Sequence, residues 1–402
     1  MQTSAEQTAA VEKRDADFIL GTYKRTSFHP RTGKGAKLVD ADGKVYWDLL
    51  AGIAVNALGY RHPRLVKALK EETAKGVLHV SNLFYHPAQG LLAERLVSRS
   101  GFPKVFFCNT GAEATEAAVK LTRLATPGRS RMIALEGGFH GRTMGALALT
   151  GNEGYRKPFE PLVGTTAFLP PNDVAALNAA ATPDTSAIFL EPVMGEGGIV
   201  PLTPEYVLAA RAAADRVGAS LVFDEIQSGL GRTGHLFVFQ ELGVTPDLVL
   251  LAKPLGGGLP LGAVLVGPKI AALVKAGQHG TTFGGNPVAC RLGLEVLEAI
   301  EEDGLLAKIR ETGEWFGKKL RTAKRKSKGA IKDVRGRGLM WGVELDRDAS
   351  DVQRKLLAKG FVVGTSRTNV LRLLPPYVVP RPALAGFLKA LEEILRETPS
   401  NP

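Results

Sequence analysis

The chain has 402 residues, of which 45% are hydrophobic and 23% are charged. This composition is typical of a globular protein, and a chain of this length predicts two or more domains. No apolar run approaches the roughly 18–20 residues that a membrane-spanning helix needs. Residues 1–14 are polar and lack the apolar segment of a secretory signal. We therefore expect a cytoplasmic protein without a membrane partner.

The net charge is +11, from 51 basic and 40 acidic residues. Such an excess can indicate nucleic acid or another anionic partner. However, the densest basic run, residues 321–328, contains no aromatic side chain that could stack on a base. We interpret this run as the solvated end of a helix and expect no nucleic-acid partner. Cys108 and Cys290 match no metal-ligand spacing, so we expect buried free thiols and no metal.

The first elements in chain order are a hairpin and a helix. Asp42-Gly43 supplies the turn between two short strands within residues 35–50. Apolar residues at helical spacing then predict a helix over 63–76. From residue 104 to 267, short apolar strands alternate with alanine-rich helices, which predicts a mostly parallel sheet with helices on both faces. The expected strands are 104–108, 132–135, 187–191, 221–224, 248–252 and 263–266, and the expected helices are 113–124, 173–181 and 204–217.

The last third of the chain has a different pattern of elements. Helices are expected at 290–302, 305–324, 352–359 and 383–396, and strands within 334–345 and at 370–374. This α+β pattern predicts a smaller C-terminal domain. The predicted division is residues 1–60 as an N-terminal segment joining the small domain, 61–285 as a large α/β domain, and 286–402 as the small domain.

Three strands of the predicted sheet end in polar residues, at the carboxyl end where ligands bind in such folds. The first leads to Glu191 and then Glu196, the second to Asp224, Glu225 and Gln227, and the third to Lys253. Lys253 follows a mostly apolar run, and burial would lower its pKa and make its amine a nucleophile for carbonyl carbons. Its alternative is a lysine that extends to water. Asp224 lies about one strand–helix–strand unit earlier, so both side chains can reach one pocket. Asp224 alone could also cap a helix or a turn.

Two loops add candidate binding groups. Residues 109–112 follow a strand and begin a helix, whose N–H groups and dipole favour an anion; the alternative is a tight connection. In the glycine-rich loop 137–142, Phe139 can cover a flat ring and Arg142 can bind a carboxylate. A packed aromatic and a surface arginine are their alternatives. His140 is a less favoured general base than Lys253.

Six stretches in this order carry a resemblance to a known family: 109–113 (NTGAE), 138–143 (GFHGRT), 191–198 (EPVMGEGG), 224–234 (DEIQSGLGRTG), 251–258 (LAKPLGGG) and 280–287 (GTTFGGNP). Over almost its full length the chain resembles class III, fold type I aminotransferases, which use pyridoxal 5′-phosphate (PLP). Within the family it is most similar to the acetylornithine aminotransferases. The resemblance implies a mostly parallel seven-stranded sheet covered by helices, with 61–285 as the PLP-binding domain, plus the smaller α+β domain.

The resemblance also implies roles for the cofactor-binding residues. Lys253 would bind PLP as a Schiff base and transfer protons, while Asp224 would pair with the pyridine nitrogen. The remaining expected cofactor contacts are Thr110, Gly111 and Ala112 at the phosphate, Phe139 and His140 at the ring, and Gln227 at the ring hydroxyl. Thr282 would reach the phosphate in the neighbouring subunit, which implies a homodimer with shared active sites.

At the substrate end, the resemblance assigns Arg142 to a substrate carboxylate and Arg372 to the α-carboxylate of glutamate or 2-oxoglutarate. Glu196 would pair with Arg372 when no anion is bound there. Thr281 and Asn56 are further expected substrate contacts. Phe84 and Tyr85, with Asn56, are expected to shape the pocket for the acyl group.

The implied reaction is ping-pong transfer of the terminal amine of N-acetylornithine to 2-oxoglutarate. It gives glutamate and N-acetylglutamate 5-semialdehyde, a step of arginine biosynthesis. Ornithine, succinylornithine, N-succinyl-diaminopimelate, 4-aminobutyrate and a carrier-protein-linked lysine or ornithine stay open as alternative amine donors. The remote alternative from another class is a non-catalytic nucleic-acid-binding protein.

Overall fold

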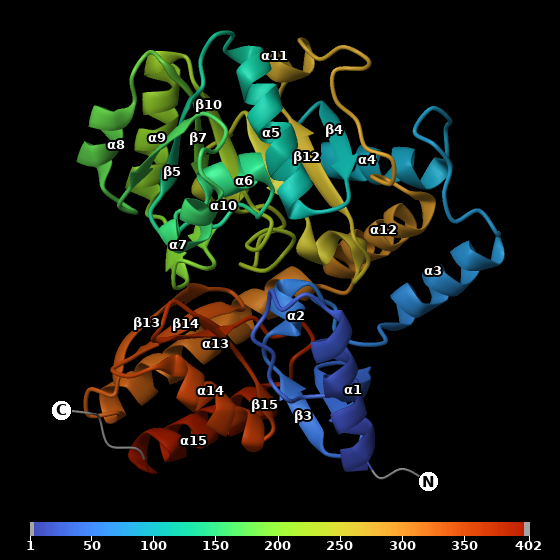
Figure 1. Cartoon of the computed structure of the whole chain (residues 1–402), viewed down its shortest axis with the longest axis vertical. Coiled ribbons are helices and arrows are strands. Elements are labelled where there is room, and N and C mark those ends of the chain that lie inside the picture. Colours follow the sequence, from blue (N-terminus) through green and yellow to red (C-terminus); the bar gives the residue numbers. More distant parts are fainter. Residues whose placement is uncertain (1–3, 398–402) are drawn as a thin grey trace.

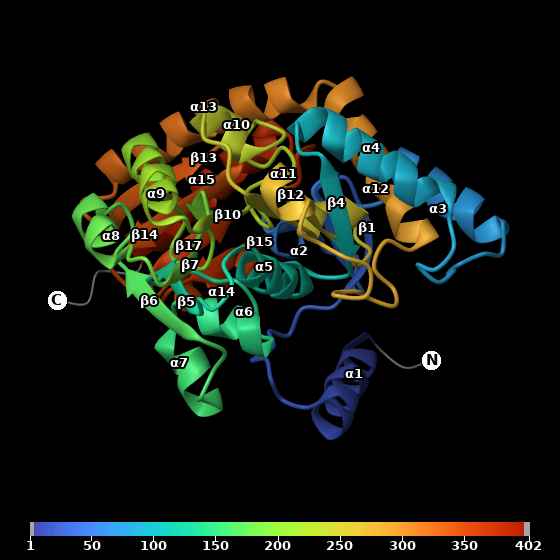
Figure 2. The same cartoon turned by 90° about the horizontal axis from the view of Figure 1, so that it is seen from above.

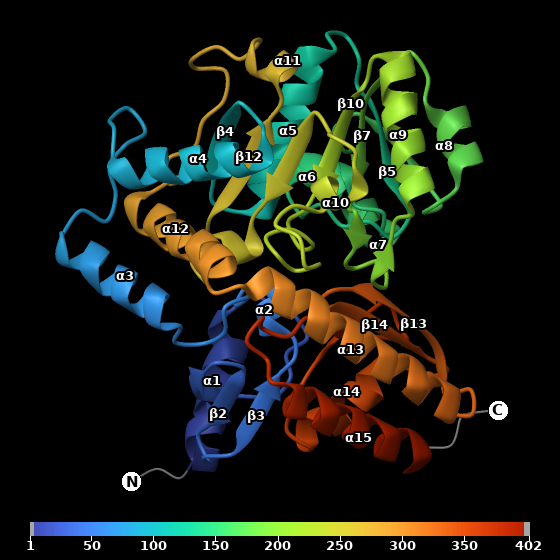
Figure 3. The ribbon, with the colours of Figure 1, turned by 180° about the vertical axis from the view of Figure 1, so that it is seen from behind.

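The computed structural model describes residues 4–397. Residues 1–3 and 398–402, which fall in the predicted N-terminal segment and C-terminal domain, lie outside the described residues. Figure 1 shows an upper half built from the middle of the chain, and a lower half in which the N-terminal and C-terminal parts lie together. The view from behind shows the same two halves (Figure 3). In this part of the chain, no helix is both long and apolar enough to cross a bilayer.

The upper half contains a seven-stranded sheet in the order β4-β12-β11-β10-β7-β5-β6. Its strands are β4 (Lys104–Cys108), β5 (Arg131–Leu135), β6 (Thr165–Leu169), β7 (Thr185–Leu190), β10 (Ser220–Asp224), β11 (Leu248–Leu251) and β12 (Gly262–Val266). Within this sheet only β12 runs antiparallel to its neighbours. The predicted fold class is therefore confirmed. The sequence analysis missed β6, because this edge strand is mostly half-exposed and has no continuous apolar run.

Helices bury both faces of this sheet. Leu221 and Phe223 of β10 belong to one hydrophobic cluster, and Val222 between them belongs to another on the opposite face. This alternation explains why the central strands are apolar at every position. One face is covered by α5 (Gly111–Ala125), α6 (Met144–Leu149) and α11 (Pro268–Ala271), and the other by α4 (Pro87–Ser100), α8 (Val174–Ala180), α9 (Pro204–Val217) and α12 (Pro287–Glu302).

The lower half contains two four-stranded sheets, β1-β2-β3-β15 and β13-β14-β17-β16. Their strands are β1 (Pro30–Lys34), β2 (Lys37–Asp40), β3 (Val45–Asp48), β13 (Ile331–Arg337), β14 (Met340–Leu345), β15 (Phe361–Val362), β16 (Gly364–Ser366) and β17 (Val370–Leu373). Strands β2 and β3 form the predicted hairpin. Phe361 of β15 pairs with Trp47 of β3, which joins the two chain ends. This pairing supports the placement of residues 1–60 with the small domain. The domain boundaries at residues 60 and 285 stay a prediction.

The remaining elements are mostly helices, and two of them are long and have buried apolar residues. They are α1 (Ser4–Phe18), α2 (Ala51–Ala54), α3 (Pro63–Ala74), α7 (Glu153–Arg156), η1 (Lys157–Phe159), β8 (Val193–Met194), β9 (Val200–Pro201), α10 (Val238–Leu242), η2 (Lys253–Gly256), α13 (Leu305–Lys326), α14 (Ala349–Ala358) and α15 (Arg381–Glu397). Figure 2 shows α1 standing apart from the body. The basic run 321–328 covers the end of α13 and the turn after it, and its charged side chains are exposed or partly exposed, as expected.

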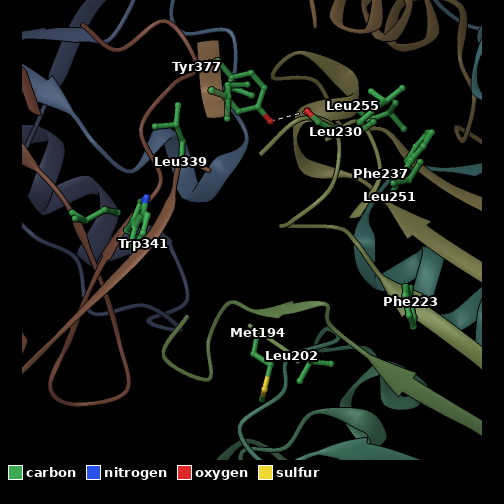
Figure 4. Close-up of a cluster of buried hydrophobic side chains, with 14 of the residues drawn as sticks. Met194, Leu202, Phe223, Leu230, Phe237, Leu251, Leu255, Leu339, Trp341 and Tyr377 are labelled. Atoms are coloured by element: carbon green, nitrogen blue, oxygen red, sulfur yellow. Dashed lines mark hydrogen bonds between the residues drawn. The ribbon is translucent and has the colours of Figure 1, made fainter. Parts of the chain in front are cut away.

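A buried cluster joins the two halves (Figure 4). Leu230 belongs to the loop after β10, whereas Leu339 and Tyr377 belong to the C-terminal part. The Tyr377 hydroxyl donates a hydrogen bond of 2.7 Å to the Leu230 carbonyl. The loop after β10 is therefore held between the halves. Cys108 and Cys290 are buried free thiols, as expected, and burial raises the pKa of each to about 12.

Candidate active site

A cavity of about 470 Å³ lies at the carboxyl ends of β4, β10 and β11. Seven of the residues expected to bind the cofactor line it together with Lys253: Thr110, Gly111, Ala112, Phe139, His140, Asp224 and Gln227. Arg142 lines it as well. Residues from four separate segments thus meet at one edge of the sheet, where the strand order places a ligand site.

Lys253 occupies a strained position directly after β11. Its φ is +33°, in the left-handed region that side chains other than glycine rarely adopt. Its side chain is partly accessible from the cavity, and it has no hydrogen-bond or ion-pair partner among residues 4–397. Burial lowers the pKa of the Lys253 amine, although Asp224 opposes this shift. A side chain whose amine is unpaired in a pocket, on a backbone that is strained, points to a function rather than to packing.

Asp224 and His140 form a buried pair beside this amine. His140 Nδ1 lies 2.7 Å from Asp224 Oδ2, and both side chains are almost fully buried. Burial disfavours the imidazolium, but the hydrogen bond and charge of Asp224, aided by Glu191, outweigh it and raise the pKa of His140. The Ile226 N–H donates to Asp224 Oδ1 at 3.0 Å. His140 therefore fixes the orientation and charge of Asp224, which is a different task from that of a general base.

Glu191 is a pocket residue to which the sequence analysis gave no role. It follows β7, and its Oε1 and Oε2 accept hydrogen bonds from the N–H groups of Phe139 (2.8 Å) and Gly195 (3.0 Å). Burial raises the pKa of Glu191 to about 7, and His140 opposes this shift. Its place at the carboxyl end of a buried strand was a usable signal. Its two backbone partners could not be read from the sequence.

The first turn of α5 offers two free backbone donors. Thr110 is the N-cap, and its side chain accepts from the Glu113 N–H while Glu113 accepts from the Thr110 N–H. The N–H groups of Gly111 and Ala112 have no hydrogen-bond partner within the described part of the chain, and both residues line the cavity. A Cβ at residue 111 would lie 2.8 Å from Ile226 Cδ1, so a larger residue there would have to displace the Ile226 side chain. This helix start can hold a phosphate.

The residues present fit PLP. Gln227 lines the cavity, and its buried Oε1 has no hydrogen-bond partner among residues 4–397, so it can accept from a ring hydroxyl. The buried carboxylate of Asp224 can pair with a protonated ring nitrogen, the Lys253 amine can react with an aldehyde, and α5 can hold the phosphate. These four groups surround one cavity large enough for such a ligand.

A second set of charges lies where the two halves meet. Arg372 of β17 forms an ion pair and hydrogen bond with Glu196. The Arg372 side chain is 5% exposed and its Nε has no hydrogen-bond partner in the described part of the chain, whereas the Glu196 side chain is 33% exposed. Arg142 instead stacks its guanidinium 3.5 Å from the centre of the Tyr155 ring, a contact that the sequence analysis missed.

Not all predicted residues reach the cavity from within this chain. Thr281 and Thr282 line a separate cavity of about 370 Å³, although Thr281 Oγ1 accepts a 3.1 Å hydrogen bond from Asn109. Asn56 does not line the main cavity, whereas its neighbour Val55 does. Phe84 and Tyr85 are exposed and lie outside it. Their predicted roles stay predictions.

Known proteins share this fold and this sequence pattern. The family model "Aminotransferase class-III" matches residues 22–395. The acetylornithine aminotransferase of Methanocaldococcus jannaschii is 44% identical over 402 residues, which cover 98% of this chain and 99% of that protein. The one from Caldanaerobacter subterraneus subsp. tengcongensis is 43% identical over 387 residues (94% and 98%). A solved ornithine aminotransferase from Toxoplasma gondii, with PLP at partial occupancy in its active site, superposes with a TM-score of 0.92 at 31% identity, covering 99% of this chain and 96% of that one. This chain therefore belongs to the PLP-dependent class-III aminotransferases.

Proposed function

We propose that the protein is N2-acetyl-L-ornithine:2-oxoglutarate aminotransferase, acting in arginine biosynthesis. The named relatives that are 42–47% identical to it over nearly its whole length support this substrate. The structural observation that carries the proposal is the Glu196–Arg372 pair, whose charges act on the Lys253 amine although neither residue lines the cavity around it. Such a pair suits an enzyme that must accept an anion at this position in one half-reaction and none in the other.

Bound PLP supplies an electron sink for the pair of electrons released at the substrate carbon. The buried Asp224 carboxylate, oriented by His140, would stabilise a positive charge at the ring nitrogen of the bound cofactor. The Lys253 amine removes the proton at the reacting carbon of the substrate and returns it elsewhere. Burial lowers the pKa of this amine, which favours the neutral form that can take up a proton. Phe139 lines the cavity, where its ring can cover one face of the cofactor ring.

The two substrates place their carboxylates differently. N-acetylornithine reacts through its terminal amine, so its carboxylate lies at the far end, at Arg142. No anion then faces Arg372, and Glu196 neutralises it. Glutamate reacts through its α-amine, so its α-carboxylate takes the place of Glu196 on Arg372 while its side-chain carboxylate binds Arg142. Because an unpaired buried charge costs several kcal/mol, Glu196 decides how well each substrate binds.

We also propose a homodimer in which Thr282 of each subunit completes the phosphate site of the other. Asn82 Nδ2 donates to the carbonyls of Thr281 (3.0 Å) and Gly284 (3.1 Å), so the loops around residues 82 and 282 lie together. These loops expose large apolar side chains: Leu83 is 86% exposed and Tyr85 104%. Contiguous exposed apolar surface of this kind supports a subunit interface.

The proposed substrate is tested by comparing initial rates for N-acetylornithine with those for ornithine, succinylornithine, N-succinyl-diaminopimelate and 4-aminobutyrate, each with 2-oxoglutarate. Mass spectrometry identifies the aldehyde product. The highest kcat/KM with N-acetylornithine supports the proposal. A preference for another amine keeps the enzyme class and replaces the substrate. A carrier-linked donor would be indicated if all the free amines react poorly.

A further inference from the structure

The backbone of Gly195 and Glu196 is held from both halves of the molecule. The Gly195 N–H donates to Glu191 Oε2 at 3.0 Å, and the Gly195 carbonyl accepts from Ser366 Oγ at 3.1 Å. The same hydroxyl lies 2.6 Å from the carbonyl oxygen of Glu196, to which it also donates. Ser366 is 3% exposed. The single proton of one buried hydroxyl is thus shared between two consecutive carbonyls of the segment that carries Glu196, with the Glu196 carbonyl the nearer acceptor.

Ser366 and Arg372 belong to the same hairpin. Gly364 of β16 is paired with Arg372 of β17, and Ser366 lies two residues further along β16. Residues two apart on a strand share a face with the residue that pairs opposite them. The hairpin therefore contacts Glu196 twice, at its backbone through Ser366 and at its carboxylate through Arg372.

The backbone of residues 195–198 has little room to move. A Cβ at residue 195 would lie 2.6 Å from the Gln227 side chain, and the Gly198 carbonyl accepts a 2.8 Å hydrogen bond from Arg335 Nε. In contrast, the Glu196 side chain is 33% exposed. An anion can therefore displace the carboxylate by side-chain rotation, while the backbone from which it returns stays in place.

We propose that Ser366 is a positioning residue that sets the balance between the two substrates. Its hydroxyl holds the backbone of Gly195 and Glu196 where the Glu196 carboxylate meets Arg372. Without this hydroxyl, the carboxylate spends less time on Arg372. A dicarboxylate then competes with a weaker internal anion and binds more tightly. A donor that leaves Arg372 without an anion loses part of the neutralisation and binds less tightly. This inference rests on the proposed function.

The test is Ser366→Ala in the holoenzyme. A lost hydrogen bond of this kind corresponds to a change of about two- to tenfold. We expect KM for glutamate and 2-oxoglutarate to fall by about that factor and KM for N-acetylornithine to rise. Ser186→Ala is the matched control, since the buried Ser186 hydroxyl donates to the Arg131 carbonyl at 2.9 Å, at the start of β7 and away from the cavity. Ser186→Ala should leave the ratio of the KM for glutamate to the KM for N-acetylornithine unchanged.

Calorimetry with unreactive probes separates positioning from general damage. Glutarate, a dicarboxylate without amine or ketone, should bind Ser366→Ala about two- to tenfold more tightly than the wild type. N-acetylnorvaline, which has the N-acetyl and carboxylate groups but no terminal amine, should not bind more tightly. Changes of both KM values in one direction, or unchanged glutarate binding, would overturn the inference. A wild-type enzyme inactive on N-acetylornithine would reject the proposed function instead, while the glutarate titration would still test Ser366.

Discussion

Removal of the negative charge at Glu196 is the perturbation with the clearest expected effect. Glu196→Gln keeps the shape of the side chain but leaves the guanidinium of Arg372 without its ion-pair partner. Two unit charges about 4 Å apart at an effective dielectric constant of ~20 interact by about 4 kcal/mol. Because the Glu196 side chain is partly exposed, solvent screening reduces this to about 1.5–3 kcal/mol. The kcat/KM for N-acetylornithine should therefore fall by about 10- to 150-fold relative to that for glutamate.

Single-turnover absorbance measurements of the two half-reactions test this expectation. Glutamate should lose little or gain, because its α-carboxylate no longer competes with Glu196. Glu314→Gln makes the same chemical change on the exposed surface of α13 and should change neither reaction. An equal loss for both substrates would refute the proposed role of Glu196, since it would show that Glu196 supports the site without distinguishing its ligands.

Three other substitutions test further parts of the account. Lys253→Ala should abolish transamination and change the absorbance of the bound cofactor while circular dichroism shows an intact fold; turnover at the wild-type rate would contradict its role. Asp224→Ala should lower kcat by several orders of magnitude, and a loss of roughly tenfold or less would argue against a charge held at the ring nitrogen. Burial raises the pKa of Glu225 from 4.5 to about 8, so its contribution to stability is full below about pH 4.5 and is lost as the pH rises to about 8. In thermal melts, the stability of Glu225→Gln relative to wild type should increase over this range, and a pH-independent difference would show that Glu225 does not titrate there.

The main sheet was predictable because its central strands are buried on both faces. Leu221, Val222 and Phe223 form a continuous apolar run for this reason, whereas the half-exposed strand β6 gave no such signal. The meeting of Asp224 and Lys253 followed from the rule that ligands bind at the carboxyl ends of parallel strands. The local sequence could therefore predict that residues at the carboxyl ends of the strands meet in one site.

The contacts that orient these residues could not be predicted in the same way. The two backbone partners of Glu191 and the carbonyl partners of Ser366 come from distant segments, and no local pattern specifies them. The stacking of Arg142 on Tyr155 depends on how the intervening chain folds back. Thr282 lies outside the main cavity of its own chain, so its role depends on the proposed partner subunit.

The most direct test of the central claim is an absorbance titration of the purified enzyme with N-acetylornithine in the absence of 2-oxoglutarate, followed by the same titration with ornithine, succinylornithine and 4-aminobutyrate. We predict that the absorbance of the lysine-bound cofactor disappears at the lowest concentration with N-acetylornithine, and that 2-oxoglutarate restores it. If no cofactor absorbance is present even after PLP is added, the proposed role of Lys253 is contradicted. If N-acetylornithine leaves the absorbance unchanged while another amine converts it, the proposed substrate is contradicted.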